Sequence, residues 1–174
     1  MSRSFIKRLS KEIQLYEKDN FCFDNLILKP TEDLSVWYFI VYDLDTETDF
    51  YNGIYLGKVN IPDKYPFSPP DFQFLTPSGR FTINQKLCTS FTGYHKELYS
   101  PSWNIASMCS GLISFMTDSQ DKKESSGIGG IITSKEERNK IANNSRFYIN
   151  THNPIKEIFE LYFKDYYTIL KINS

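Results

Sequence analysis

Four short segments rich in Val, Ile and aromatic residues follow one another in the first half of the chain, and they constrain the fold more than any other feature. They span residues 23–29, 35–42, 53–61 and 71–75. β-Branched and aromatic side chains favour strands. The links between the segments are short, and parallel neighbours would need long crossover connections. The sequence therefore predicts a four-stranded antiparallel meander sheet.

Helical periodicity flanks this sheet on both sides. Apolar side chains recur at three- or four-residue spacing before the strands, at Phe5, Leu9, Ile13 and Tyr16, which predicts an opening helix. After the strands, residues 104–116 are apolar on most faces and predict a central helix. The order of helix, sheet and helices is typical of the α+β class.

Two further helices are predicted near the C terminus. Ser134 followed by Glu137 has the spacing of a capping box and predicts a helix through about residue 148. Pro154 is suited to the first turn of a last helix. We expect one domain over residues 1–165, followed by a C-terminal tail over residues 166–174.

A long segment without periodicity, residues 76–101, separates the last strand from the central helix. Loops of this length inside a compact domain are uncommon and are usually functional. Cys88 lies in its middle, whereas Cys109 lies on the apolar central helix and Cys22 at the start of a strand. Cys88 is therefore the candidate nucleophile, and the alternative is that all three cysteines are small apolar side chains.

The composition excludes several classes of protein. Lys plus Arg number 20 and Asp plus Glu 21 among 174 residues, a balance that argues against a nucleic-acid-coating protein. Three cysteines without a CxxC pair indicate a reducing compartment, and only two histidines make a metal site unexpected. The longest apolar run, residues 36–42, is too short to span a bilayer, so we expect a soluble protein of the cytoplasm.

The order of several motifs resembles the ubiquitin-conjugating enzymes. The chain has Tyr-Pro-Phe-x-Pro-Pro at residues 65–70, Leu-Cys at 87–88, and Ser-Pro-Ser-Trp at 100–103 before the central helix. The resemblance implies the ubiquitin-conjugating (UBC) fold, with Cys88 receiving ubiquitin as a thioester from the activating enzyme and passing it to a substrate lysine. It also implies no cofactor for this chain, because ATP is used by the upstream activating enzyme.

A subgroup of that family is indicated by Thr-Pro-x-Gly-Arg-Phe at residues 76–81, by Asn84, and by the pair Tyr94-His95. These features resemble the tail-anchored enzymes associated with the endoplasmic reticulum. The resemblance implies a role in endoplasmic-reticulum-associated degradation, at the cytosolic face of that membrane. It further implies a membrane anchor if the natural protein is longer, and serine or threonine acceptors beside lysine in some members.

The chain departs from the family at one position that matters for chemistry. Most members carry His-Pro-Asn shortly before the cysteine, whereas this chain has Thr-Pro-Ser at residues 76–78. An amide there would stabilise the oxyanion or order the loop. Ser78 and Asn84 are the candidate replacements for the asparagine side chain. The third alternative is that the reaction does not need this amide. His95 is a candidate base or orienting group, and the alternative is a loop histidine bonded to the backbone.

Partner-binding residues also follow from the resemblance. Phe67, Pro101 and Ser102 match the two loops with which the family grips ligases, although Phe67 would instead be buried if it packs under the prolines. Lys7 and Arg8 match the helix face that meets the activating enzyme, and a merely solvated face is the alternative. The expected partners are ubiquitin, the activating enzyme, a ligase and protein substrates, without nucleic acid.

Two rival functions remain at this point. A catalytically weak or silent UBC-fold adaptor, which binds partners of the ubiquitin pathway, is favoured by the missing asparagine. A cysteine hydrolase that uses Cys88 and His95 would need a third catalytic group, and the sequence offers no clear one.

Overall fold

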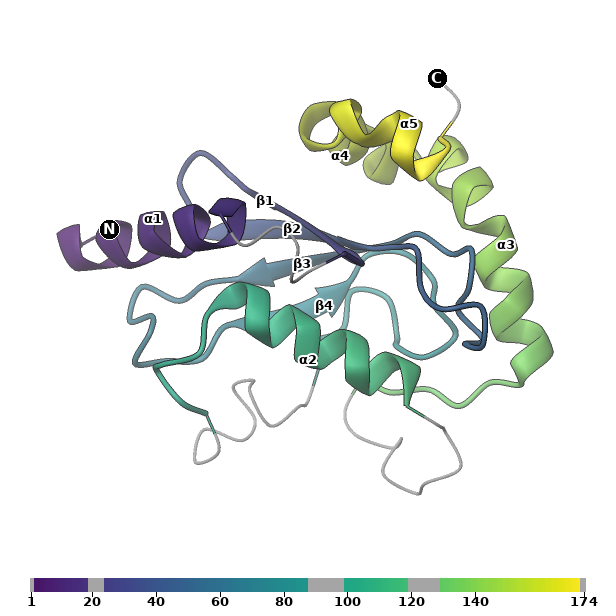
Figure 1. Cartoon of the computed structure of the whole chain (residues 1–174), viewed down its shortest axis with the longest axis horizontal. Helices are drawn as coiled ribbons and strands as arrows, with labels where there is room; N and C mark the ends of the chain where they lie inside the picture. Colours follow the sequence, from purple (N-terminus) through teal and green to yellow (C-terminus); the bar gives the residue numbers. More distant parts are fainter. Residues whose placement is uncertain (1, 19–23, 88–98, 119–128, 173–174) are drawn as a thin grey trace.

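A computed structural model of the chain describes residues 2–18, 24–87, 99–118 and 129–172 (Figure 1). It confirms an α+β architecture with an N-terminal helix, a four-stranded sheet and several helices after the sheet. The elements, in chain order, are α1 (Arg3–Lys18), β1 (Leu26–Pro30), β2 (Val36–Val41), β3 (Tyr55–Asn60), β4 (Asp71–Phe74), α2 (Ile105–Thr117), α3 (Lys135–Thr151), α4 (Asn153–Tyr162), η3 (Lys164–Tyr166) and α5 (Tyr167–Leu170).

The sheet is the predicted meander, with strand order β1-β2-β3-β4 and antiparallel pairing throughout. Phe39 on β2 lies opposite Gly57 on β3, and Gly57 lies opposite Phe74 on β4. A Cβ atom at Gly57 would lie 2.1 Å from the Phe39 ring. Glycine is therefore required there, because the Phe39 ring lies directly over the neighbouring strand.

Helices cover both faces of the sheet and form two apolar clusters. The cluster on one face joins α1 and α2 to the sheet through residues such as Phe5, Phe39 and Leu112. The cluster on the other face joins the sheet to the C-terminal helices through Leu56 and Phe159, among others. Figure 1 shows α2 on one side of the sheet and α4 with α5 on the other.

The segment predicted as a tail contributes to the second cluster. Leu170 and Ile172 are 1% and 5% exposed, and both belong to this cluster. No break in packing therefore marks residue 165 as the end of the folded domain. The reason is that η3 and α5 are too short to show a helical period in the sequence, so their burial depends on the tertiary fold.

Helix starts follow local sequence chemistry. The Ser134 hydroxyl accepts a hydrogen bond from the Glu137 amide at 3.2 Å, as the spacing predicted. Pro154 lies in the first turn of α4. α3 thus shows the N-cap half of the expected capping box, whereas α2 begins with both halves: the Asn104 side chain accepts from the Ser107 amide, and the Ser107 side chain accepts from the Asn104 amide. Within the described residues, no helix combines the length and hydropathy needed to cross a membrane.

Candidate active site and partner surface

The end of the sheet holds the chain in place just before the predicted nucleophile. The Leu87 amide donates to the Phe72 carbonyl at 2.9 Å, and the Asn84 amide donates to the Phe74 carbonyl at 2.8 Å. The Leu87 side chain is only 2% exposed and belongs to the first apolar cluster. Residues 84–87 are thus fixed against β4. Cys88 and His95 themselves lie outside the described residues.

A distant segment packs against these residues. The Thr82 amide donates to the Gly129 carbonyl at 2.8 Å, and the Ile131 amide donates to the Arg80 carbonyl at 2.9 Å. Gly129 has a φ of +87°, and a Cβ atom there would lie 3.0 Å from Leu87 Cδ2. Gly129 therefore allows residues 129–131 to pack closely against residues 80–87, the segment that leads to Cys88.

Ser78 has a structural task in this loop. It is completely buried, and its hydroxyl oxygen accepts from the amides of Arg80 at 3.2 Å and Phe81 at 3.1 Å. The Ser78 hydroxyl is therefore occupied by hydrogen bonds within the loop, whereas Asn84, the other candidate replacement for the family asparagine, is exposed.

Asn84 is exposed and has a φ of +61°. Asparagine tolerates this left-handed backbone conformation better than most residues. Its position, four residues before Cys88, leaves an amide side chain at the surface of the turn. Asn84 therefore presents a side-chain hydrogen-bond donor to solvent four residues before Cys88.

Arg80 stands eight residues before Cys88, and its side chain is buried. It is 3% exposed, and its guanidinium lies 4.7 Å from the centre of the Phe115 ring. Nη2 donates to the Phe115 carbonyl at 3.5 Å, whereas Nε and Nη1 have no hydrogen-bond partner among the described residues. Burial lowers the pKa of Arg80, and the nearby Arg138 guanidinium lowers it further. Arg80 therefore packs against Phe115 near the C-terminal end of α2.

Cys109 is the one cysteine in the described part of the chain, and it is unsuited to nucleophilic chemistry. It is free, 1% exposed, and packed in the first apolar cluster. Burial raises the pKa of its thiol, which disfavours the reactive thiolate. In the described ranges, no cluster of His, Cys, Asp and Glu could hold a metal ion.

The residues predicted to grip a ligase lie at the surface. Phe67 is 84% exposed, so the alternative that it packs under the prolines is wrong. Pro101 and Ser102 are exposed, and Trp103 beside them is 36% exposed. The two loops approach each other where the Tyr65 hydroxyl lies 3.5 Å from the Trp103 carbonyl oxygen. We call Phe67, Pro101, Ser102 and Trp103 the partner surface.

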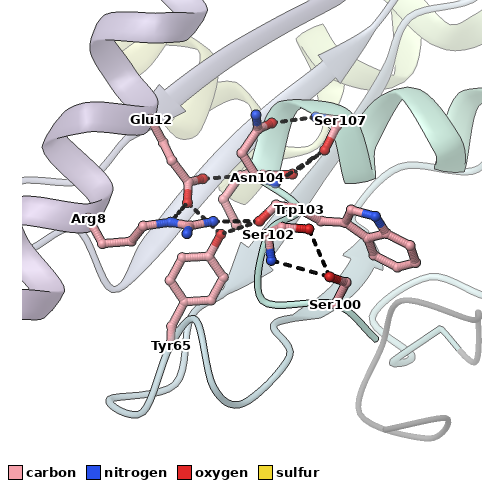
Figure 2. Close-up of polar contacts among 9 residues, drawn as sticks. Arg8, Glu12, Tyr65, Ser100, Ser102, Trp103, Asn104 and Ser107 are labelled. Atoms are coloured by element: carbon pink, nitrogen blue, oxygen red, sulfur yellow. Dashed lines mark hydrogen bonds and ion pairs between the residues drawn. The ribbon is translucent and has the colours of Figure 1, made fainter. Parts of the chain in front are cut away.

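The two basic residues of α1 differ in their availability. Lys7 is exposed, as a solvated or partner-binding residue would be. Arg8 is only partly exposed, and its Nε pairs with the Glu12 carboxylate at 2.5 Å. Arg8 Nη2 also donates to the Trp103 carbonyl at 2.6 Å (Figure 2). Arg8 therefore has contacts within the fold that link α1 to the partner surface.

Glu12 is a residue of this region that the sequence analysis missed. It is 5% exposed, and Figure 2 shows its carboxylate between Arg8, Tyr65 and the start of α2. Burial, and then the Glu12 charge, raise the pKa of Tyr65. The sequence does contain a signal for its burial, because Glu12 lies three residues after Leu9 and four before Tyr16, on the apolar face of the helix.

Comparison with known proteins identifies the family. The family model for ubiquitin-conjugating enzyme matches residues 8–148. The chain belongs to the ubiquitin-conjugating enzyme family. The matched range includes all the candidate site residues except Lys7. This membership confirms the UBC fold inferred from the motifs, and it places Asn84, Phe67 and the Cys88 motif within the part of the chain that the family shares.

Individual relatives carry the same name. The chain is 36% identical over 155 residues to "Ubiquitin-conjugating enzyme E2 6" of Eremothecium gossypii, which covers 88% of this chain and 61% of that protein. It is 34% identical to the Schizosaccharomyces pombe protein of the same name, and the match covers 88% of this chain and 64% of that protein. It is 31% identical to "Ubiquitin-conjugating enzyme E2 J2-like" of Dictyostelium discoideum, and the match covers 91% of this chain and 89% of that protein. The chain thus spans less than two thirds of the E2 6 relatives' length.

Proposed function

We propose that this chain receives ubiquitin from the activating enzyme as a thioester on Cys88 and transfers it to a lysine of a protein substrate. The observation that carries the proposal is the match to the family model across residues 8–148, which includes the Leu-Cys motif at 87–88. In the first step the Cys88 thiolate attacks the thioester carbonyl of ubiquitin on the activating enzyme. One sulfur–carbon bond breaks as another forms, so the acyl group stays activated.

The fixed position of Leu87 supports this assignment. A nucleophile works best when rigid elements hold it close to its reacting geometry. Discharge then requires an amine to attack the thioester carbonyl through a tetrahedral oxyanion. The carbonyl–sulfur bond breaks, Cys88 leaves as the thiolate, and the amine's proton passes to that thiolate or to water. We propose that the exposed Asn84 amide donates a hydrogen bond to that oxyanion. We assign to His95 the role of accepting a proton when the attacking group is a hydroxyl.

The proposed partners follow from the exposed residues. Ligases would bind the partner surface around Phe67, and the activating enzyme would bind the α1 face that carries Lys7. We further propose that the natural protein acts in endoplasmic-reticulum-associated degradation at the cytosolic face of that membrane. The Thr-Pro-x-Gly-Arg-Phe motif at residues 76–81 supports this, as does the Tyr94-His95 pair.

A thioester assay tests the proposal. The chain is incubated with activating enzyme, ATP and ubiquitin, and the adduct is resolved with and without a thiol reductant. We expect an adduct that the reductant removes, that Cys88→Ala abolishes, and that Cys22→Ala and Cys109→Ala retain. Cys88→Ser should form an oxygen ester that survives the reductant, because a hydroxyl replaces the thiol. An adduct that persists in Cys88→Ala would overturn the assignment.

One observation favours a second candidate function. The family asparagine is absent, and neither the buried Ser78 nor the buried Arg80 takes its place at the surface. A UBC-fold adaptor that binds ligases without carrying ubiquitin would tolerate this loss. The same assay distinguishes the two functions, because an adaptor forms no adduct while it still binds a ligase through Phe67.

A further inference from the structure

We propose that Glu12 is a positioning residue that holds the two loops of the partner surface at a fixed spacing. The inference rests on the proposed function, because it concerns the surface that would bind a ligase. It goes beyond that function in assigning the geometry of an exposed surface to one buried carboxylate on a different element, α1.

The Glu12 carboxylate accepts hydrogen bonds from three segments of the chain (Figure 2). Oε1 accepts from Arg8 Nε at 2.5 Å and from the Tyr65 hydroxyl at 2.6 Å. Oε2 accepts from the Ile105 amide at 2.8 Å. Tyr65 and Ile105 lie 53 and 93 residues away in the sequence, so one side chain connects α1, the proline-rich loop and the start of α2.

Each of these bonds ends close to a residue of the partner surface. Tyr65 lies two residues before Phe67, and the Phe67 amide donates to the Lys64 carbonyl at 2.8 Å within the same turn. Ile105 lies two residues after Trp103, whose carbonyl accepts from Arg8 at 2.6 Å. In both loops, therefore, only one residue lies between the group that donates to Glu12 and the aromatic residue of the partner surface.

The exposure of Phe67 makes this tie necessary. At 84% exposure its ring has little packing of its own, so its position depends on the backbone beneath it. The Glu12 side chain, by contrast, is only 4% exposed. Hydrogen bonds to a buried charge are stronger than neutral ones, and a buried acceptor that loses its donors is costly. Glu12 therefore resists movement of either loop away from the other.

The two tryptophans of the chain supply a direct measurement. Trp103 lies in the partner surface, whereas Trp37 is 1% exposed in the first apolar cluster. In protein labelled with fluorotryptophan, Glu12→Gln should shift or broaden the Trp103 fluorine resonance and leave that of Trp37 unchanged. Glu17→Gln is the matched control, because it removes the same charge from an exposed site on the same helix. It should change neither resonance.

Two outcomes of this measurement overturn the proposal. An unchanged Trp103 resonance would show that Glu12 does not position its loop. Equal changes at Trp103 and Trp37 would show a general loss of packing. If Glu12→Gln does not fold, Tyr65→Phe replaces it, since this change keeps the Glu12 charge and removes the hydroxyl that donates to Glu12 and lies 3.5 Å from the Trp103 carbonyl oxygen. It should move the Trp103 resonance in the same direction by a smaller amount, and no movement would again overturn the proposal.

Ligase-stimulated discharge tests the functional consequence. The probe is the catalytic domain of a ubiquitin ligase chosen because it stimulates the unmutated, charged chain. Glu12→Gln should reduce the stimulated rate about tenfold, the effect of losing about one charged hydrogen bond. In a Phe67→Ala background it should add little, because both changes act on the same contact. Independent, additive losses would overturn the proposal. Failure of Cys88 to charge would instead contradict the proposed function and leave the fluorine measurement to decide.

Discussion

At the scale of single residues, exposure decides which side chains can take part in chemistry or binding. Cys109 is enclosed by apolar side chains, and burial raises the pKa of its thiol, so it stays protonated near neutral pH. Phe67 has the opposite environment, with most of its ring in water. A large aromatic side chain that is exposed in the free protein can contribute strongly to an interface. These environments assign Cys109 to packing and Phe67 to recognition.

Phe67→Ala should slow ligase-stimulated discharge at least tenfold, because an aromatic anchor contributes about 2 kcal/mol or more to an interface. Charging by the activating enzyme should change much less. Both rates can be measured by single-turnover assays with labelled ubiquitin. Phe147→Ala is the matched control, since this ring on α3 is 71% exposed and lies outside the partner surface. An equal loss of charging in Phe67→Ala would show that the residue acts through the fold.

At the scale of elements, an ion pair fixes the start of α3 and the segment before it. Arg138 on α3 pairs with Asp49, in the β2–β3 connection, through Nη2 at 2.5 Å and Nε at 3.0 Å. Its Nη1 also donates to the Thr133 carbonyl. The Thr133 hydroxyl in turn donates to the Gly79 carbonyl at 2.6 Å. These contacts fix Thr133, which follows the packed segment 129–131, between α3 and Gly79.

Asp49→Asn should lower the free energy of unfolding by about 2 kcal/mol, because it leaves the Arg138 charge with a weaker partner at a site that is 9% exposed. The measurement is denaturant unfolding at neutral pH. Glu160→Gln is the control. Its carboxylate lies 3.8 Å from Lys156 Nζ with both side chains about half exposed, and such a pair contributes less than about 1 kcal/mol. Equal losses in the two variants would contradict this interpretation.

At the scale of the whole molecule, the two faces of the sheet hold different parts of the chain. α1 and α2 pack on one face of the sheet and α4 and α5 on the other, whereas α3 contributes Ala142 to the first apolar cluster and Ile149 to the second. Tyr16 helps to join α1 to the edge strand, because its hydroxyl donates to the Leu26 carbonyl at 2.9 Å and accepts from the Leu28 amide at 3.2 Å. Burial raises the pKa of Tyr16 to about 12.

Stability should therefore fall in alkaline solution. Tyr16 ionises near its ordinary pKa of about 10 in the unfolded chain but only near about 12 in the folded one. Its contribution is complete below about pH 10 and is lost as the pH rises toward 12. Tyr16→Phe should reduce the slope of unfolding free energy against pH in that window by up to about 1.4 kcal/mol per pH unit. Unfolding titrations of both proteins measure this difference, and identical slopes would contradict it.

The sequence by itself determined the four strands, the helices α1 to α4 and the order of these elements. Segments rich in β-branched and aromatic residues predicted β2 and β3, helical spacing predicted α1 and α2, and Ser134 with Glu137 marked the start of α3. Such patterns can be seen in a sequence because propensity, amphipathicity and capping act over a few neighbouring residues. The ordered motifs around residues 65–70 and 87–88 likewise indicated the family before any contact was known.

The tertiary structure alone decided which polar groups became buried partners. Ser78 and Arg80 belong to the motif at residues 76–81, and both side chains are buried, while Asn84 remains at the surface. Glu12 meets groups 53 and 93 residues away, and Gly129 packs against Leu87. A buried hydrogen bond forms only after distant segments have folded together, so no local pattern records its partner. For the same reason the contact between α1 and the partner surface was visible only in the folded chain.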